Sequence, residues 1–209
     1  MAKPLHNWSA AFAVMLAGTI VSYAWIDRPL AYFVHDHVTN KLIFDLLQRI
    51  PDIFPALAAV TFAICAINVL IGRRRSHTET VALMASVSFA AARLVNTQLK
   101  FAFGRTWPET WIGNPSLIAD GVYGFNPFHG GEGFASFPSG HAVASCAVAA
   151  VLWLYWPRLR PLYALAVAAV FIGLIGADYH FLSDVIAGAF FGVLAGWVTA
   201  RIWPPVTAS

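Results

Sequence analysis

Two histidines and one aspartate have the residue types and spacing needed for nucleophilic catalysis. His180 precedes Asp184 by four residues, and His141 follows a Pro-Ser-Gly tripeptide. If a helix begins by His180, this spacing puts both side chains on one helical face. A carboxylate bonded to one imidazole nitrogen fixes the tautomer and makes the other nitrogen a better nucleophile or base. We expect such a pair here; a helix-start aspartate beside an interfacial histidine is the structural alternative.

The tripeptide Ser139-Gly140-His141 has the features of a helix N-terminus that binds an anion. Ser139 is a suitable N-cap, and Gly140 lets a ligand approach the backbone closely. The first free N–H groups and the positive end of the helix dipole attract an anion, with His141 in the first turn. Taken alone, the tripeptide is explained better as an ordinary capped helix with an interfacial histidine.

Lys100 adds a cation at the end of another apolar stretch. Two histidines, an aspartate, a lysine and a helix N-terminus together describe a phosphoryl-transfer site that uses neither a metal nor a cofactor. One histidine would attack phosphorus and the other would protonate the leaving oxygen, while cations and amides would hold the equatorial oxygens. His35 and His37 have no ligand set nearby, so we expect them to face solvent rather than a metal.

The composition of the chain indicates a membrane protein. Of its 209 residues, 59% are hydrophobic and 11% are charged, whereas soluble domains carry about 25% charged residues. These values exclude a disordered chain, a collagen-like fibre and a small disulfide scaffold. Cys65 and Cys146 both lie in apolar stretches, which predicts two free, buried thiols.

Six stretches are apolar enough to cross a hydrocarbon core of about 30 Å. Because backbone groups in lipid must be bonded internally and strand-like alternation is absent, we expect helices. The sequence predicts one all-α domain over residues 1–209, a six-transmembrane-helix bundle with spans at about 8–26, 53–72, 80–103, 139–156, 161–177 and 183–203. We expect the first span to be retained rather than removed as a signal peptide, because it is long and because Asp27-Arg28 marks its membrane exit.

Three further patterns describe the parts around these spans. The segment from Pro29 to Ile50 is amphipathic and predicts an interfacial helix, or an ordinary helix that covers the bundle. The segment from Gly104 to Phe137 is rich in glycine, proline and aromatic residues, which predicts an ordered cap. Gly188, Gly192 and Gly196 recur every fourth residue and predict close helix packing, with dimerisation as the alternative.

Lysine and arginine are concentrated on one side of the predicted topology. With the N-terminus in the cytoplasm, the cytoplasmic segments hold Lys3, Arg73, Arg74, Arg75, Arg158, Arg160 and Arg201. All acidic residues except Glu79 fall on the opposite face. Lys100, the tripeptide that ends at His141, and the pair of His180 and Asp184 lie on that face as well. The net charge of +3 is therefore a topology signal. It predicts that both termini are cytoplasmic and that nucleic acid is not a partner.

These motifs resemble the three signatures of the type 2 phosphatidic acid phosphatase superfamily, the membrane lipid phosphatases related to glucose-6-phosphatase. That family has a Lys followed by Arg-Pro, then Pro-Ser-Gly-His, then Ser-Arg ahead of His-x-x-x-Asp. The resemblance covers nearly the whole chain and implies a six-helix fold with an outward-facing site. It implies that His180 is a nucleophile that forms a phosphohistidine, that Asp184 orients it and that His141 is the general acid. The family's phosphate-binding positions correspond to Lys100, Ser139 and Gly140.

Two positions depart from the family pattern. The first signature has Trp107 in place of its arginine, and the third has Gly173-Leu174 in place of Ser-Arg. Both arginines that clamp the phosphate in that family are therefore missing from their usual places. We expect Arg105 to bind the phosphate instead. We expect Arg93, two helical turns before the signature lysine, to support the bundle.

The leading interpretation is an integral membrane phosphatase that acts at the periplasmic face of a bacterial inner membrane. Candidate substrates are phosphatidic acid, phosphatidylglycerophosphate, polyprenyl diphosphate and the lipid A phosphates. One alternative is a phosphotransferase that passes the phosphoryl group from His180 to a second lipid. Another is a non-catalytic lipid-binding or transport protein, which the intact pair of His180 and Asp184 argues against. The sequence does not indicate an oligomeric state.

Overall fold

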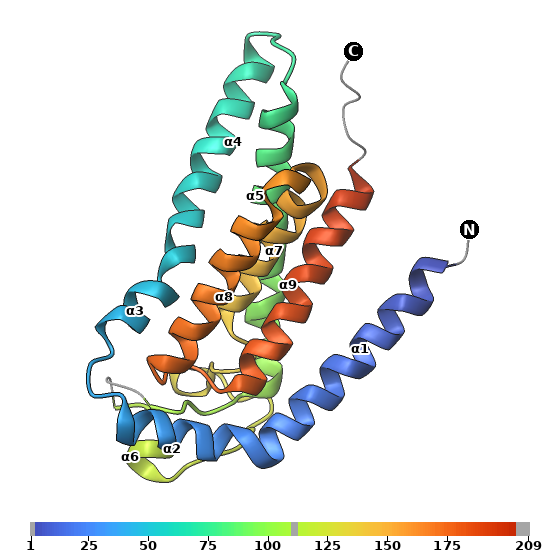
Figure 1. Cartoon of the computed structure of the whole chain (residues 1–209). Coiled ribbons are helices and arrows are strands. Elements are labelled where there is room, and N and C mark those ends of the chain that lie inside the picture. The colour runs from blue at the N-terminus through green and yellow to red at the C-terminus, as the bar shows by residue number, and fades with distance from the viewer. Residues whose placement is uncertain (1–2, 110–112, 204–209) are drawn as a thin grey trace.

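Helices dominate the computed structural model, which describes the backbone of residues 3–109 and 113–203 and side chains from residue 8 (Figure 1). The α-helices in these ranges are α1 (Lys3–Val21), α2 (Asp27–His37), α3 (Leu42–Gln48), α4 (Phe54–Leu70), α5 (His77–Phe103), α6 (Leu117–Asp120), α7 (Gly140–Tyr155), α8 (Arg160–Gly176) and α9 (Leu182–Ile202). The same ranges hold isolated β-bridges but no strand. The predicted all-α fold is confirmed.

The chain is a multi-pass membrane protein. Five helical segments are long and apolar enough to cross a membrane: Trp8–His37, Ile50–Leu70, His77–Phe103, Pro157–Gly176 and Leu182–Ile202. The span predicted at 139–156 corresponds to α7, an apolar helix of 16 residues, which is shorter than a full crossing. α7 packs against α5, α8 and α9, so neighbouring helices cover much of its surface.

The first helix does not end at the predicted membrane exit. A π-helical turn covers Ser22–Ile26, and α2 continues directly from it at Asp27. The chain bends at this turn, so that α2 runs beneath the bundle at the end where α5 stops and α9 begins (Figure 1). Asp27 is 1% exposed. Asp27 and Arg28 therefore begin a second helix, and Asp27 is buried within the protein.

The amphipathic segment after the first span forms two helices rather than one. α2 ends at His37 and α3 begins at Leu42. α3 packs on α8, where two glycines leave room for Phe44. A Cβ on Gly176 would lie 2.3 Å from the Phe44 ring, and one on Gly173 would lie 2.7 Å from its carbonyl oxygen. This contact agrees with the alternative of a helix that covers the bundle.

Three glycines allow α9 to pack closely on α7, as predicted. A Cβ on Gly188 would lie 2.7 Å from the Ser139 carbonyl oxygen, and one on Gly192 would lie 2.4 Å from the Val143 carbonyl oxygen. Gly196 is equally close to the next turn of α7. Larger residues at these positions would push the two helices apart and separate the residues at their first turns.

An ordered loop connects α5 to α7 at this end of the bundle. Gly104 ends α5 in the left-handed conformation with φ of 56°, and a Cβ there would lie 1.8 Å from the Asn126 carbonyl oxygen. Isolated bridges join Arg105 to Phe125 and to Ala135. The described part of this loop therefore folds back on itself, as expected of an ordered cap.

Candidate active site

The second and third sequence motifs are joined through their backbones. The Ser139 N–H donates to the Asp184 carbonyl oxygen at 3.1 Å, which links the first turns of α7 and α9. Ser139 Oγ accepts from the Ala142 N–H at 3.4 Å, the bond expected of an N-cap. The N-terminus of α7 is thus held beside the turn that carries His180.

His180 and Asp184 form the predicted pair, although α9 begins later than expected, at Leu182. His180 Nδ1 lies 3.2 Å from Asp184 Oδ2. The same carboxylate oxygen accepts from the Phe181 N–H at 3.0 Å and from Ser136 Oγ at 2.6 Å. A proton on Nδ1 directed at this carboxylate leaves the lone pair on Nε2, which can then act as a nucleophile.

Burial determines the electrostatics of His180. Its side chain is 1% exposed, and its ring packs against the ring of Trp107 with centroids 5.1 Å apart. Desolvation lowers the pKa of His180 to about 4, although the hydrogen bond to Asp184 acts in the opposite direction. His180 is therefore neutral at physiological pH, as a nucleophile must be.

Arg105 is placed differently from the expectation that it meets the phosphate. Its side chain is fully buried, and its guanidinium donates to the carboxylates of Asp27 and Asp184 and to Ser183 Oγ. Nη2 lies 2.7 Å from Asp27 Oδ2. Because both terminal nitrogens are used on internal partners, the geometry argues against a phosphate contact. Arg105 instead holds the carboxylate that contacts His180.

Asp27 is a site residue that sequence reasoning missed. Its carboxylate accepts hydrogen bonds from Ser22, Arg105, Tyr123 and Ser183. It therefore extends the buried chain of charges by one carboxylate, in the order Asp27, Arg105, Asp184 and His180. The available signal was an acidic residue within a long apolar helix, because such a charge usually faces the protein interior with a partner.

The guanidinium of Arg93 reaches the N-terminus of α7. A Cβ on Gly140 would lie 2.3 Å from Arg93 Nη1 and 3.4 Å from Asn96 Nδ2. Gly140 therefore makes room for a guanidinium beside the first free N–H groups of the helix. Within the described part of the chain, neither Arg93 nor Lys100 pairs with a carboxylate. Two cations without a carboxylate partner and a helix N-terminus together attract an anion.

His141 lies in the first turn of α7 and contacts Asp52, a residue that no motif singles out. Its Nε2 is 3.1 Å from Asp52 Oδ1. Its ring packs edge-on against Tyr179 with centroids 5.8 Å apart. Asp52 belongs to the short 3₁₀ turn that precedes α4. The Asp52 carboxylate thus fixes the orientation of the His141 ring, and an imidazole held in this way can transfer a proton to or from a reacting group.

A family model described as the PAP2 superfamily matches residues 81–207, more than half of the chain. The chain belongs to the PAP2 superfamily. It is 36% identical over 114 residues to the lipid A 1-phosphatase of Rhizobium johnstonii and 37% identical over 114 residues to that of Rhizobium etli. Each match covers 53% of this chain and 43% or 45% of the relative. The match thus spans less than half the length of either relative.

The PAP2 fold is also found in a solved structure. A crystal structure of a transmembrane PAP2 type phosphatidylglycerolphosphate phosphatase from Bacillus subtilis superposes with a TM-score of 0.55. The superposition covers 93% of this chain and 94% of that chain, at 17% sequence identity. The likeness confirms the predicted membrane fold.

Trp107 occupies the position at which the PAP2 pattern has its first arginine. Lys100 Nζ lies 5.5 Å from the centroid of the Trp107 ring, and the indole also packs on His180. Its Nε1 donates to the Glu132 carbonyl oxygen at 2.7 Å. An aromatic ring that contacts both Lys100 and His180 therefore stands at this position.

The second departure from the PAP2 pattern lies in the packed core. Leu174 is fully buried against Val170 and Val185. Its carbonyl oxygen accepts from the His180 N–H at 3.2 Å. Gly173 is required by the packing of α3, as described above. Gly173 and Leu174 thus support the turn that carries His180, and neither offers a charged side chain to a ligand.

Proposed function

We propose that the chain is a membrane phosphatase that removes a phosphate from a phosphorylated lipid. The observation that carries this proposal is the buried pair of His180 and Asp184 beside a helix N-terminus and two cations, Arg93 and Lys100, which pair with no carboxylate among the described residues. A protein that only binds lipid has no use for a nucleophile held in one tautomer. Membership of the PAP2 superfamily and the two lipid A 1-phosphatase relatives support the same activity.

The proposed reaction has two steps. In the first, His180 Nε2 attacks phosphorus, the bond from phosphorus to the lipid oxygen breaks, and His141 donates a proton to that oxygen. In the second, water attacks the phosphohistidine with His141 as base, which releases inorganic phosphate and regenerates His180. Asp184 keeps the imidazole in one orientation and stabilises its positive charge as the new bond forms.

Lys100, Arg93 and the N-terminus of α7 bind the phosphate oxygens in this proposal. Negative charge spreads over three oxygens in the transition state, and donors arranged in advance stabilise that charge. Ser139 caps the helix, and Gly140 keeps Arg93 within reach. The roles first expected of the two arginines are thereby exchanged, since Arg105 positions Asp184. All cations come from the chain, so the reaction uses neither a metal ion nor a cofactor.

Lipid A-type glycolipid phosphates are the first substrates to test, because both relatives are named lipid A 1-phosphatases. Phosphatidic acid, phosphatidylglycerophosphate and polyprenyl diphosphate follow, since each presents the same phosphate group on a membrane lipid.

We propose a bacterial inner membrane as the location, with both termini in the cytoplasm and the site facing the periplasm. Arg73, Arg74 and Arg75 support this orientation. They lie in the connection between α4 and α5, at the end of the bundle opposite the site (Figure 1). Short cytoplasmic loops carry an excess of such residues.

The test is phosphate release by purified protein from the four lipid classes, with His180→Ala as the control. Wild-type protein should release phosphate from at least one lipid in excess chelator, and the variant from none. Folded wild-type protein that binds these lipids without releasing phosphate contradicts the proposal. Transfer of the label to a second lipid instead of water identifies a phosphotransferase.

A further inference from the structure

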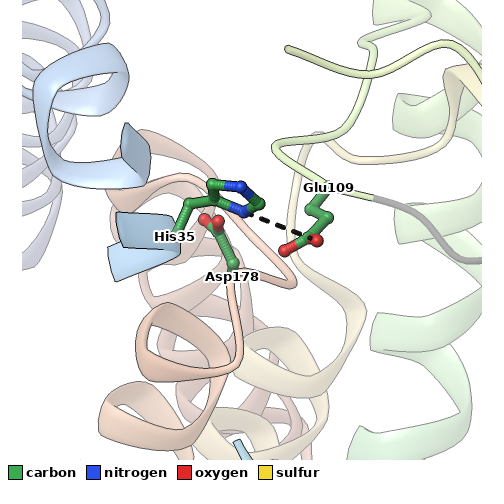
Figure 2. Close-up of side chains that lie close together, drawn as sticks. All are labelled: His35, Glu109 and Asp178. Carbon is green, nitrogen blue, oxygen red and sulfur yellow. Dashed lines mark ion pairs between the residues drawn. The ribbon is translucent and has the colours of Figure 1, made fainter. Parts of the chain in front are cut away.

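A second cluster of polar side chains lies where three segments meet (Figure 2). His35 comes from α2, Glu109 from the loop after α5, and Asp178 from the turn between α8 and α9. One imidazole nitrogen and one oxygen of each carboxylate lie within 4.8 Å of one another. His35 Nδ1 is 3.6 Å from Glu109 Oε1. The mechanism proposed above uses none of these groups.

Asp178 indicates that the cluster lacks a ligand. The residue is 2% exposed, and its Oδ2 atom is buried without a hydrogen-bond partner. Lys41 Nζ is 3.9 Å from this oxygen, which is too far for a hydrogen bond. The side chain points toward His35, with Glu109 on the other side of the imidazole ring's edge (Figure 2). A buried carboxylate oxygen without a partner is unfavourable, and a cation bound within the cluster would compensate it.

We propose that His35, Glu109 and Asp178 bind a divalent metal ion, with Zn²⁺ as the best match. Zn²⁺ accepts imidazole nitrogen together with carboxylate oxygen at about 2.0–2.2 Å, whereas Ca²⁺ and Mg²⁺ select oxygen ligands. Tetrahedral ligands at that length are about 3.4 Å apart. The 3.6 Å between His35 Nδ1 and Glu109 Oε1 is already close to this spacing. Only the Asp178 carboxylate must move closer to the other two ligands. Water completes the fourth position.

Lys41 competes for the same carboxylates. Its ammonium forms an ion pair with Glu109 and lies near Asp178, so one positive charge serves two carboxylates. A bound Zn²⁺ must displace the ammonium from Glu109. Removal of Lys41 therefore distinguishes a metal site, which binds more tightly without it, from an ion-pair network, which needs the lysine.

The metal ion would tie two segments to the turn that carries the proposed nucleophile. Asp178 precedes His180 by two residues, and Glu109 follows Trp107 by two residues. Zn²⁺ at this site stabilises the fold from outside the reacting groups. It should raise the Tm of the protein, and its removal should leave phosphate release in place.

The test is titration of purified full-length protein in detergent with ZnCl₂ after treatment with chelator, followed by calorimetry and thermal unfolding. We expect one site per chain and a Tm that rises on binding. Binding should weaken at least about tenfold in Glu109→Gln and in His35→Ala, and tighten several-fold in Lys41→Ala. Asp178→Asn should also weaken binding, but this variant of a buried residue could fail to fold. Glu109 is half-buried, so we expect Glu109→Gln to fold and to give the decisive result.

The matched control is His37→Ala. His37 lies two residues from His35 on the same helix, but its Nδ1 contacts the Phe33 carbonyl oxygen at 2.9 Å rather than the cluster. Zn²⁺ affinity should be unchanged in this variant. Absence of Zn²⁺ binding by the wild type overturns the proposal. So does binding that is lost in His37→Ala, or binding that is unchanged in both Glu109→Gln and Lys41→Ala.

Discussion

Arg105 and Asp184 form an ion pair that is completely buried within the site. Asp184 directs Oδ1 to the guanidinium and Oδ2 to His180 Nδ1. One carboxylate therefore connects a cation that is inaccessible to substrate with the imidazole that we propose as the nucleophile. Arg105 therefore positions Asp184, whereas Arg93 remains the arginine that we propose to bind phosphate.

Arg105→Lys should lower both thermal stability and activity. A lysine keeps the charge but cannot bridge Asp27 and Asp184 with two nitrogens. We expect the free energy of unfolding to fall by about 2 kcal/mol, which is less than the roughly 3–5 kcal/mol lost when one partner of a buried ion pair is removed. Thermal unfolding in detergent and initial rates measure the two effects. Wild-type stability with a raised KM alone would show that Arg105 binds substrate.

Arg93→Lys should leave the Tm unchanged and lower kcat/KM by about 10²-fold, the effect of losing one preorganised donor to transition-state charge. Arg93 has no carboxylate partner among the described residues, so its replacement breaks no internal ion pair. Arg74→Lys, at the opposite end of the bundle, is the control and should behave as wild type. A destabilised Arg93→Lys protein with normal kinetics would restore the role of structural support.

Gly140→Ala should reduce activity through Arg93. The added Cβ would lie 2.3 Å from Arg93 Nη1, so the flexible guanidinium must move while the helix is retained. We expect a rate loss of the same order as in Arg93→Lys, and a double variant little slower than either single one. Rate measurements on the complete double-mutant cycle check this. Fully additive losses would mean that the two residues act independently.

His141→Ala should separate substrates by their leaving groups. Lipid phosphates leave as alkoxides that need a proton, so their turnover should fall by about 10²–10⁴-fold. An aryl phosphate such as p-nitrophenyl phosphate needs little protonation and should retain most of its rate in the first step. Burst kinetics report that step. Equal losses with both substrates would assign His141 to phosphate binding instead of proton transfer.

Much of this fold could be predicted from the sequence because hydropathy and short spacings act locally. All six predicted spans are helical, and the four-residue spacing brings His180 to Asp184 even though α9 begins after the histidine. The Ser139 cap follows from its own turn in the same way. Such features depend on few residues and on no long-range contact.

The partners of the arginines could not be predicted, because they depend on how distant segments are placed. A π-helical turn at Ser22–Ile26 brings Asp27 beneath the bundle, where it meets Arg105. No periodicity in the sequence marks that bend. The reach of Arg93 to Gly140 likewise depends on the packing of α5 against α7. The sequence spacing indicated only that Arg93 lies two helical turns before Lys100.

The most direct measurement is rapid acid-free quench of the wild-type protein with a lipid phosphate labelled with ³²P at the phosphate to be removed. A phosphohistidine at His180 predicts a protein-bound label that is stable to base, labile to acid and recovered on the peptide containing His180. His180→Ala should bind the same lipid and carry no label. A labelled His180→Ala protein, or a wild-type protein that releases phosphate without any labelled intermediate, would contradict the covalent mechanism.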